Sequence, residues 1–350
     1  MSNSPPADAG TAGAGNVPHV VVVTGASAGV GRAAARAFAA RGDRVALLAR
    51  GAAGLEGAAA DVQSAGGTPL VLPVDIADPD AVERVAEDVE RELGAIEVWV
   101  NNAMTTVFAP LADITPEEFR RATEVTYLGA VWGTMTALRH MRPRGRGVII
   151  QVGSALAYRA IPLQAPYCGA KHALRGFTDA IRCELLHEKS GIEIAMVHLP
   201  ALNTPQFSWC RAKLPRHPQP VPPIFQPEVA ARAIVETADR PRRELWVGWP
   251  TVKTIGGNKV VPGLADRYLA RIGYEAQQTD AAFDADRRDN LFAPVDDESD
   301  FGSRGILEDR SETRSLELEA SLHRRGIALT AAAAASLAGI GGWLLGRRQP

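Results

Sequence analysis

Three side chains in the middle of the chain could together move a proton: Ser154, Tyr167 and Lys171. Tyr167 and Lys171 stand four positions apart, so on a helix they share one face and the ammonium can lie beside the phenol. A tyrosine with its ordinary pKa of about 10 is a poor acid–base group at neutral pH, but a nearby cation lowers that pKa. A serine hydroxyl can stabilise negative charge that develops on a carbonyl oxygen. The triplet therefore predicts proton transfer to or from a carbonyl or alcohol oxygen, with Tyr167 as the general acid/base.

Such a pair also arises by chance on solvated helices, so the surrounding elements have to decide. The apolar run 19–23 predicts a strand that is buried on both faces, and residues 32–41 predict an Ala-rich helix. Between them, Gly25 permits a tight turn, Gly29 lets a pyrophosphate approach the backbone, and Gly31 allows close packing of helix on strand. The helix N-terminus would offer its N–H groups to the phosphates, so this turn predicts dinucleotide binding.

The end of the next strand, residues 44–49, bears on the choice of cofactor. A carboxylate at this point would bind the adenosine ribose 2′-OH of NAD, whereas an arginine accommodates the 2′-phosphate of NADP. The sequence has Ala49 followed by Arg50, which predicts NADP and makes NAD the less favoured cofactor. The alternative is that Arg50 is an ordinary solvated residue at a strand end.

Strands and helices alternate through the rest of the first 250 residues. This alternation predicts an α/β fold: a single Rossmann-type, doubly wound domain with a seven-stranded parallel sheet flanked by helices. The further strands are expected at residues 70–74, 96–100, 147–152, 193–199 and 243–247.

Four motifs in order resemble the short-chain dehydrogenase/reductase family: TGxxxGxG at residues 24–31, NNA at 101–103, Ser154, and YxxxK at 167–171. The resemblance spans roughly residues 18–250. It implies an NAD(P)-dependent oxidoreductase that interconverts a secondary alcohol and a ketone or aldehyde, with Ser154, Tyr167 and Lys171 as catalytic residues. It also implies a homodimer or homotetramer. The cofactor-binding residues that it implies are Thr24, Gly25, Ser27, Gly29, Val30, Gly31, Arg50, Asp75, Ile76, Asn101, Asn102, Ala103, Tyr167, Lys171, Pro200 and Thr204.

The sequence departs from the family pattern at several positions. Met104 stands where the family has glycine, Thr126 where it often has a water-binding asparagine, and Ala201 replaces a further glycine. These departures keep open an alternative function, a catalytically weak NADP-binding scaffold or sensor at a membrane. An epimerase or dehydratase of the extended family branch is the weaker alternative, because those chains often carry a TGxxGxxG turn.

A proline-rich segment, residues 205–227, follows the sixth strand. It holds seven prolines together with Phe207, Trp209 and Phe225. Loops of this length usually cover a binding site, so we expect a lid that favours an apolar carbonyl or alcohol substrate. The alternative is a contact between subunits.

Composition bears on partners. The formal net charge is −2, which disfavours nucleic-acid binding. The three cysteines lack CxxC spacing and the histidines lack metal-ligand spacing, so we expect no metal site and a reducing compartment.

The two ends of the chain differ from the middle. Residues 1–17 predict a disordered start, and the predicted domain covers residues 18–274. A charged linker is expected at 275–325, because charged residues crowd a stretch with little apolar periodicity. Residues 326–346 form an apolar segment long enough to cross a bilayer as a helix, but their Ala-rich composition also suits a helix that packs on protein. We therefore expect a cytoplasmic protein, tethered to a membrane if this tail inserts.

Overall fold

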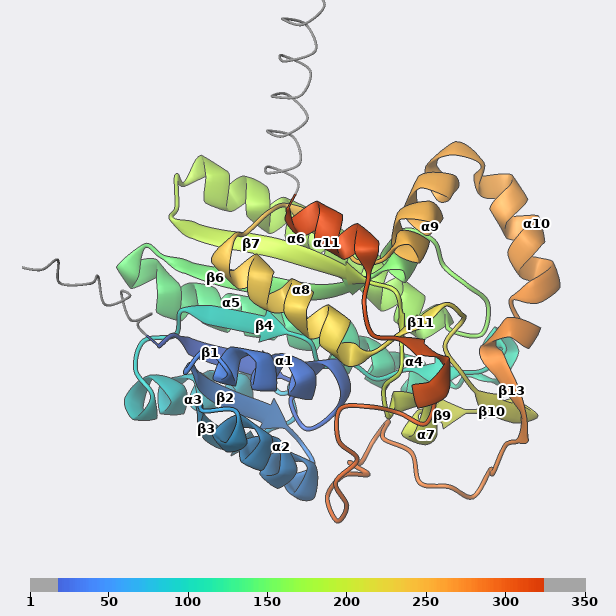
Figure 1. Cartoon of the computed structure of the whole chain (residues 1–350), viewed down its shortest axis with the longest axis horizontal. Helices are drawn as coiled ribbons and strands as arrows, with labels where there is room; N and C mark the ends of the chain where they lie inside the picture. Colours follow the sequence, from blue (N-terminus) through green and yellow to red (C-terminus); the bar gives the residue numbers. More distant parts are fainter. Residues whose placement is uncertain (1–17, 324–350) are drawn as a thin grey trace, which may run out of the picture.

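Seven parallel strands form the central sheet of the computed structural model, which describes residues 18–323. Their order is β12-β7-β6-β4-β1-β2-β3, so the winding direction reverses between β1 and β4 (Figure 1). The predicted doubly wound, seven-stranded parallel sheet is thus confirmed. The strands are β1 (Val20–Thr24), β2 (Arg44–Ala49), β3 (Thr68–Pro73), β4 (Val98–Asn101), β6 (Gly147–Ser154), β7 (Ile192–Leu199) and β12 (Glu244–Trp246).

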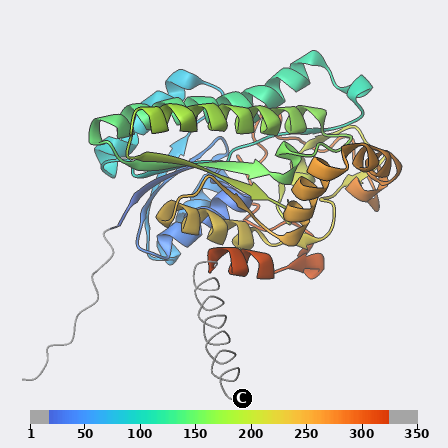
Figure 2. The same cartoon turned by 90° about the horizontal axis from the view of Figure 1, so that it is seen from above.

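Helices cover both faces of this sheet (Figure 2). Successive side chains of a strand point to opposite faces, and β1 shows why an all-apolar strand is needed: Val21 and Val23 pack into one core, Val20 and Val22 into the other. The helices are α1 (Gly29–Ala39), α2 (Ala52–Ser64) and α8 (Pro227–Asp239) on the first face, and α3 (Pro79–Glu92), α5 (Gly129–Met141) and α6 (Ala165–His187) on the second.

A capped helix begins directly after Thr115. Thr115 caps α4 (Pro116–Thr123) and forms a capping box with Glu118. The helix does not run on unbroken, because one π-helical turn over Glu124–Leu128 joins α4 to α5. Such turns often occur at functional sites.

The proline-rich segment 205–227 has short elements of its own. The helix α7 (Gln206–Trp209) is followed by strands that each pair with another part of the chain. These pairs are β9 (Arg211–Ala212) with β5 (Val107–Phe108), β10 (Arg216–Pro218) with β13 (Gln278–Ala282), and β11 (Ile224–Phe225) with β8 (Ala201–Leu202) and β14 (Ser311–Glu312).

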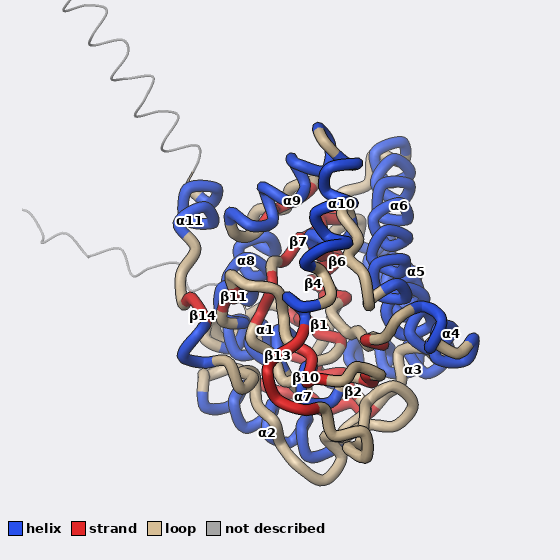
Figure 3. The backbone as a smooth tube through the Cα atoms, turned by 90° about the vertical axis from the view of Figure 1, so that its right-hand side faces the viewer, coloured by secondary structure: helices blue, strands red, loops and turns tan. Residues whose placement is uncertain are grey.

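Two further helices, α9 (Trp249–Val260) and α10 (Pro262–Ile272), lie beyond the carboxyl ends of the central strands. Figure 3, which looks onto this end, shows both helices in front of the sheet. They form one side of the region where a ligand of a doubly wound sheet is expected to bind.

The predicted charged linker is wrong for residues 275–323. Leu291 is fully buried, and α11 (Leu316–Leu322) places Leu318 and Leu322 in the core beside α8. High charge density and weak apolar periodicity do not prevent order here, because some of these charges are paired, as in Arg304 with Glu308. A few well-placed leucines then suffice to anchor the segment.

The outermost parts of the chain fall outside the described residues. They include the predicted disordered start, 1–17, and the apolar segment 326–346. Between residues 18 and 323, no helix is long and apolar enough to cross a membrane.

Candidate active site

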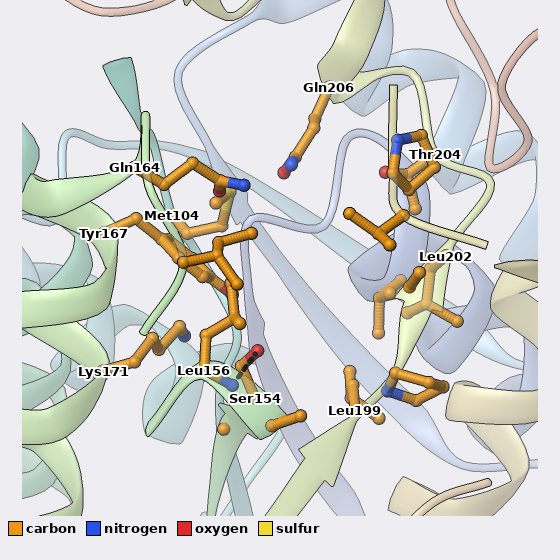
Figure 4. Close-up of a pocket in the computed structure, with 18 of the residues that line it drawn as sticks. Met104, Ser154, Leu156, Gln164, Tyr167, Lys171, Leu199, Leu202, Thr204 and Gln206 are labelled. Carbon is orange, nitrogen blue, oxygen red and sulfur yellow. Dashed lines mark hydrogen bonds between the residues drawn. The ribbon is translucent and has the colours of Figure 1, made fainter. Parts of the chain in front are cut away.

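A cleft of about 870 Å³ lies at the carboxyl ends of the central strands. Figure 4 shows its two walls facing each other: Ser154, Tyr167 and Lys171 on one side, and Leu199 and Leu202 on the other. In a doubly wound sheet this is the position where nucleotide ligands bind.

The structure brings the predicted catalytic triplet together at this cleft. Ser154 ends β6, and Tyr167 and Lys171 lie in the first two turns of α6. The Lys171 Nζ is 5.6 Å from the centroid of the Tyr167 ring and donates a 2.7 Å hydrogen bond to the carbonyl of Val152. The lysine is thus fixed beside the tyrosine, as the i, i+4 spacing predicts.

The protonation of this triplet differs from the expectation in one respect. Burial raises the pKa of Tyr167 to about 12, although a hydrogen bond with Ser154 opposes the rise. Burial also lowers the pKa of Lys171 to about 8. The loss of solvation outweighs any attraction between the two groups, so Tyr167 is a neutral phenol, which is a proton donor.

A buried polar network holds Ser154 from behind. The Nδ1 of His198 lies 3.1 Å from the Ser154 carbonyl, and its Nε2 lies 3.6 Å from Glu244. Tyr158 donates a hydrogen bond to Glu244, and the guanidinium of Arg175 lies 3.9 Å from the Tyr158 ring centroid. Burial lowers the pKa of His198, so the ring is neutral and donates to Ser154. The sequence did not indicate this contact, because no local motif connects His198 with Ser154.

The glycine-rich turn has the shape that a dinucleotide requires. Gly25 and Gly29 have positive φ values of +66° and +57°, which favour glycine. A Cβ on Gly25 would lie 2.7 Å from the Cα of Ala103, and one on Gly31 would lie 2.1 Å from the Gly25 carbonyl oxygen. The turn therefore excludes side chains at these positions, which fits the close backbone approach of a pyrophosphate.

Thr24 ties this turn to the end of β4. Its hydroxyl accepts hydrogen bonds from the backbone N–H groups of Asn102 and Ala103 and donates to the carbonyl of Val100. The amide of Asn102 in turn donates to the carbonyls of Thr24 and Gly25. Thr24 shapes the cleft without lining it.

Asn101 also points away from the cleft. Its amide accepts a hydrogen bond from the indole of Trp99 and donates to the Ala130 carbonyl and the Thr134 hydroxyl. It anchors β4 to α5. Three of the predicted cofactor residues therefore do not line the cleft: Asn101, Thr24 and Gly31. The others line the cleft: Gly25, Ser27, Gly29, Val30, Arg50, Asp75, Ile76, Asn102, Ala103, Tyr167, Lys171, Pro200 and Thr204.

Arg50 and Asp75 mark the other end of the cleft. The Arg50 guanidinium donates to the backbone carbonyls of Asn290 and of Phe292, the latter at 3.1 Å. Asp75 pairs with Arg121 and accepts a hydrogen bond from the Ala77 N–H, and these contacts lower its pKa despite burial. Both side chains are therefore charged at neutral pH.

Two of the departures from the family pattern, Met104 and Thr126, have different surroundings. Met104 lines the cleft beside Tyr167 (Figure 4). The Thr126 hydroxyl, by contrast, donates to the Thr105 carbonyl at 2.7 Å and accepts from its N–H at 3.0 Å. It holds the loop after β4 and does not line the cleft, so a direct role in proton relay is not supported by its position.

Apolar side chains form much of the remaining wall. In the predicted lid, Phe207 and Trp209 line the cleft, whereas Phe225 packs in the core. The sequence did not single out several other lining residues: Leu156, Gln164, Leu199, Leu202, Gln206, Leu264, Tyr268, Asn290 and Asp296.

Cys168, next to Tyr167, is buried, and burial raises the pKa of its thiol to about 11. The thiol is therefore protonated and is a poor nucleophile. Within residues 18–323, no group of three or more His, Cys, Asp or Glu side chains is placed to hold a metal ion.

A doubly wound parallel sheet with a glycine-rich turn after its first strand defines a dinucleotide-binding fold. The sequence profile of the short chain dehydrogenases matches residues 19–214. The chain belongs to this family of NAD(P)-dependent oxidoreductases.

Relatives extend the similarity along the chain. An uncharacterized oxidoreductase of Bacillus subtilis, YxnA, is 29% identical over 94% of this chain and 91% of its own length. The rat dehydrogenase/reductase SDR family member 7B is 34% identical over 51% of this chain, which spans 56% of that relative.

Two solved structures, each 26% identical, share the fold. A short-chain dehydrogenase from Streptomyces avermitilis superposes with a TM-score of 0.60, over 73% of this chain and 98% of its own. An alcohol dehydrogenase from Thermococcus sibiricus, complexed with 5-hydroxy-NADP, gives a TM-score of 0.58 over 66% and 96%.

Proposed function

We propose that the protein is an NADP-dependent oxidoreductase that interconverts a secondary alcohol with a ketone or aldehyde. The observation that carries the proposal is the convergence of Ser154, Tyr167 and Lys171 in one cleft with the glycine-rich turn. The cofactor supplies or accepts the hydride. The chain's own residues handle the proton and the charge on the substrate oxygen.

In the direction of reduction, Ser154 donates a hydrogen bond to the carbonyl oxygen of the substrate and so stabilises its developing negative charge. Tyr167 then gives its phenolic proton to that oxygen. The raised pKa of Tyr167 keeps this proton in place until it is needed. Lys171, buried and bonded to the Val152 carbonyl, supplies positive charge beside the phenol. It would also bond the nicotinamide ribose, as in the family pattern.

The remaining cofactor residues would hold the other end of the molecule. Gly25, Gly29 and Thr204 lie where the pyrophosphate and nicotinamide would pass, and Arg50 would bind the 2′-phosphate of NADP. The backbone carbonyls of Asn290 and Phe292 use two of the five N–H groups of Arg50, which leaves donors for phosphate oxygens. Replacing Arg50 with Gln should weaken NADP binding about tenfold and leave NAD binding unchanged, since a charge-assisted hydrogen bond is lost.

The proposed substrate is an apolar carbonyl compound or alcohol. Phe207 and Trp209 of the predicted lid and the leucines of the opposite wall support this choice. Deleting residues 207–225 should raise the KM for apolar ketones, and an unchanged KM would contradict the lid.

The main test is NADPH oxidation across a panel of carbonyl compounds, with Tyr167→Phe as the inactive control. The alternative function is an NADP-binding scaffold or sensor with little turnover, which Met104 in the cleft keeps open. Equal NADPH binding without turnover in both proteins would favour that alternative.

Assembly and location are also proposals. We propose a homodimer or homotetramer that pairs through α5 and α6, where Met135 and Leu186 are exposed; light scattering would measure the mass. We propose that the enzyme works in the cytoplasm. Fractionation of cells that express the chain with and without residues 327–350 would test whether the tail tethers it to a membrane.

A further inference from the structure

A segment from far along the sequence crosses one end of the cleft. We call residues 289–305 the C-terminal strap; it lies beyond the family match, which ends at residue 214. The carbonyl of Asp296 accepts a hydrogen bond from the Gly54 N–H at 2.9 Å, and that of Gly302 from the Gly29 N–H at 3.2 Å. Asp300 pairs with Arg32. The strap is therefore attached to the start of α2 and to the glycine-rich turn (Figure 1).

One side chain of the strap, Asp296, lines the cleft and is 8% exposed. A Cβ on Gly51 would lie 2.0 Å from its Oδ1, and a Cβ on Gly54 would lie 2.6 Å from its Oδ2. The same Cβ on Gly54 would lie 2.9 Å from the Cβ of Ser27. The carboxylate is thus wedged between the residue that follows Arg50 and the glycine-rich turn.

The Asp296 carboxylate makes no hydrogen bond within the described part of the chain. No residue between 18 and 323 donates to it, although Asp296 lines the cleft. Burial lowers the pKa of the Arg50 guanidinium, whereas the negative charges of Asp75 and Asp296 favour its charged form. A buried carboxylate with open acceptor sites is costly unless a ligand or ordered water completes it.

Glycine at position 51 is explained by the position of Asp296. Its φ of −81° is accessible to any residue, so the backbone conformation does not require glycine here. Glycine is required because any larger side chain would clash with Asp296. Gly51 and Asp296 are therefore a matched pair, one from the end of β2 and one from the strap.

We propose that Asp296 is a cofactor-selecting residue that accepts a hydrogen bond from the adenosine ribose 2′-OH and opposes a 2′-phosphate. In a doubly wound domain this is the task of an acid at the end of the second strand. Here Arg50 follows directly after that strand, and the acid comes from the strap. Arg50 attracts the 2′-phosphate and Asp296 repels it, so Asp296 limits the preference for NADP. The inference rests on the cofactor site of the proposed function.

The test uses the full chain and two probes of the adenosine end: adenosine 2′,5′-bisphosphate, which carries the 2′-phosphate, and ADP, which does not. Calorimetric titration gives the Kd of each. Replacing Asp296 with Asn or Ala should tighten adenosine 2′,5′-bisphosphate about tenfold, because a nearby like charge is removed. ADP should bind equally or slightly more weakly.

Asp297→Asn is the matched control. Asp297 is the next residue of the strap, pairs with Arg288 and is 37% exposed, so the ratio of the two Kd values should stay within about twofold of wild type. A Cβ on Gly51 would also lie 2.6 Å from the Asp296 backbone carbonyl carbon, so Gly51→Ala displaces Asp296 as a whole and keeps its charge. It should move the ratio in the same direction as Asp296→Asn.

An unchanged ratio in Asp296→Asn and Asp296→Ala, with melting temperatures near wild type, would overturn the inference. The titrations need no turnover, so they are separate from the test of function. If the protein reduces no carbonyl but the variants shift the ratio, the role of Asp296 is supported and the proposed reaction is contradicted. If the protein reduces carbonyls but the variants do not shift the ratio, the proposed reaction is supported and the role of Asp296 is contradicted.

Discussion

The two ends of the cleft are built in different ways. At the end with Ser154, Tyr167 and Lys171, the groups come from β6 and the helix that follows it, within 18 consecutive residues. At the end with Arg50, the groups come from β2 and from the C-terminal strap, which is 240 positions away in sequence. The reacting groups are thus fixed by local spacing, whereas the surroundings of the adenosine end depend on a distant segment.

The two ends therefore serve different functions: one carries out proton transfer, and the other selects the cofactor. A helix holds Tyr167 and Lys171 at a set distance whatever the rest of the chain does. The strap can change the charge near Arg50 without touching the reacting groups. Variants at the first end should therefore alter turnover, and variants at the second should alter stability or the choice of cofactor.

The largest expected effect is at Tyr167. Replacing it with Phe should lower kcat for carbonyl reduction by about 10²–10⁴, the usual contribution of a general acid. NADPH affinity should stay near wild type, as measured by fluorescence titration. Tyr127→Phe is the control, because that ring makes an edge-to-face contact with Phe177 and does not line the cleft. A comparable loss of kcat there would show that the effect at Tyr167 is not specific to the cleft.

A somewhat smaller loss is expected at Ser154. Replacing it with Ala removes the donor that stabilises the substrate oxygen and should lower kcat by roughly 10²–10³. The KM for NADPH should change little, in contrast to variants at the Arg50 end. Steady-state kinetics would measure both, with the exposed Ser64→Ala as the reference. A raised KM for NADPH at unchanged kcat would place Ser154 with cofactor binding instead.

The strap itself should be stabilising. Leu291 is fully buried against Val107, Ala109 and Ala122, so Leu291→Ala should reduce the free energy of unfolding by about 2–5 kcal/mol. Leu316, which is 85% exposed, provides the matched control and should cost no more than about 0.5 kcal/mol when replaced with Ala. Urea denaturation measures both. A linker would give equal, small changes.

The pH dependence of reduction should follow Lys171 rather than Tyr167. Burial lowers the pKa of Lys171 to about 8 and raises that of Tyr167 to about 12. The lysine cation is present below its pKa and is lost above it, so kcat/KM should fall about tenfold per unit above roughly pH 8. A profile that stays flat to pH 10 would show that the charge of Lys171 is not needed.

The sequence predicts the catalytic end of the cleft better than the Arg50 end. The sheet, the glycine-rich turn and the catalytic triplet could be predicted because each depends on local periodicity and spacing. The strap could not, since its order comes from long-range partners such as Asp300 with Arg32 and Leu291 with the β5 region. Asn101 shows a second limit: the motif located it at the right strand end, but its side chain turns to Trp99 and α5 rather than to the cleft.

In the proposed reaction, Tyr167 supplies the proton that accompanies hydride transfer from NADPH to a carbonyl carbon. The most direct measurement is a single turnover: protein saturated with NADPH is mixed with apolar ketones and aldehydes, and the nicotinamide absorbance is followed with time. We expect wild type to oxidise one bound NADPH per active site and Tyr167→Phe to retain it over the same period. Equal rates in the two proteins would contradict the account.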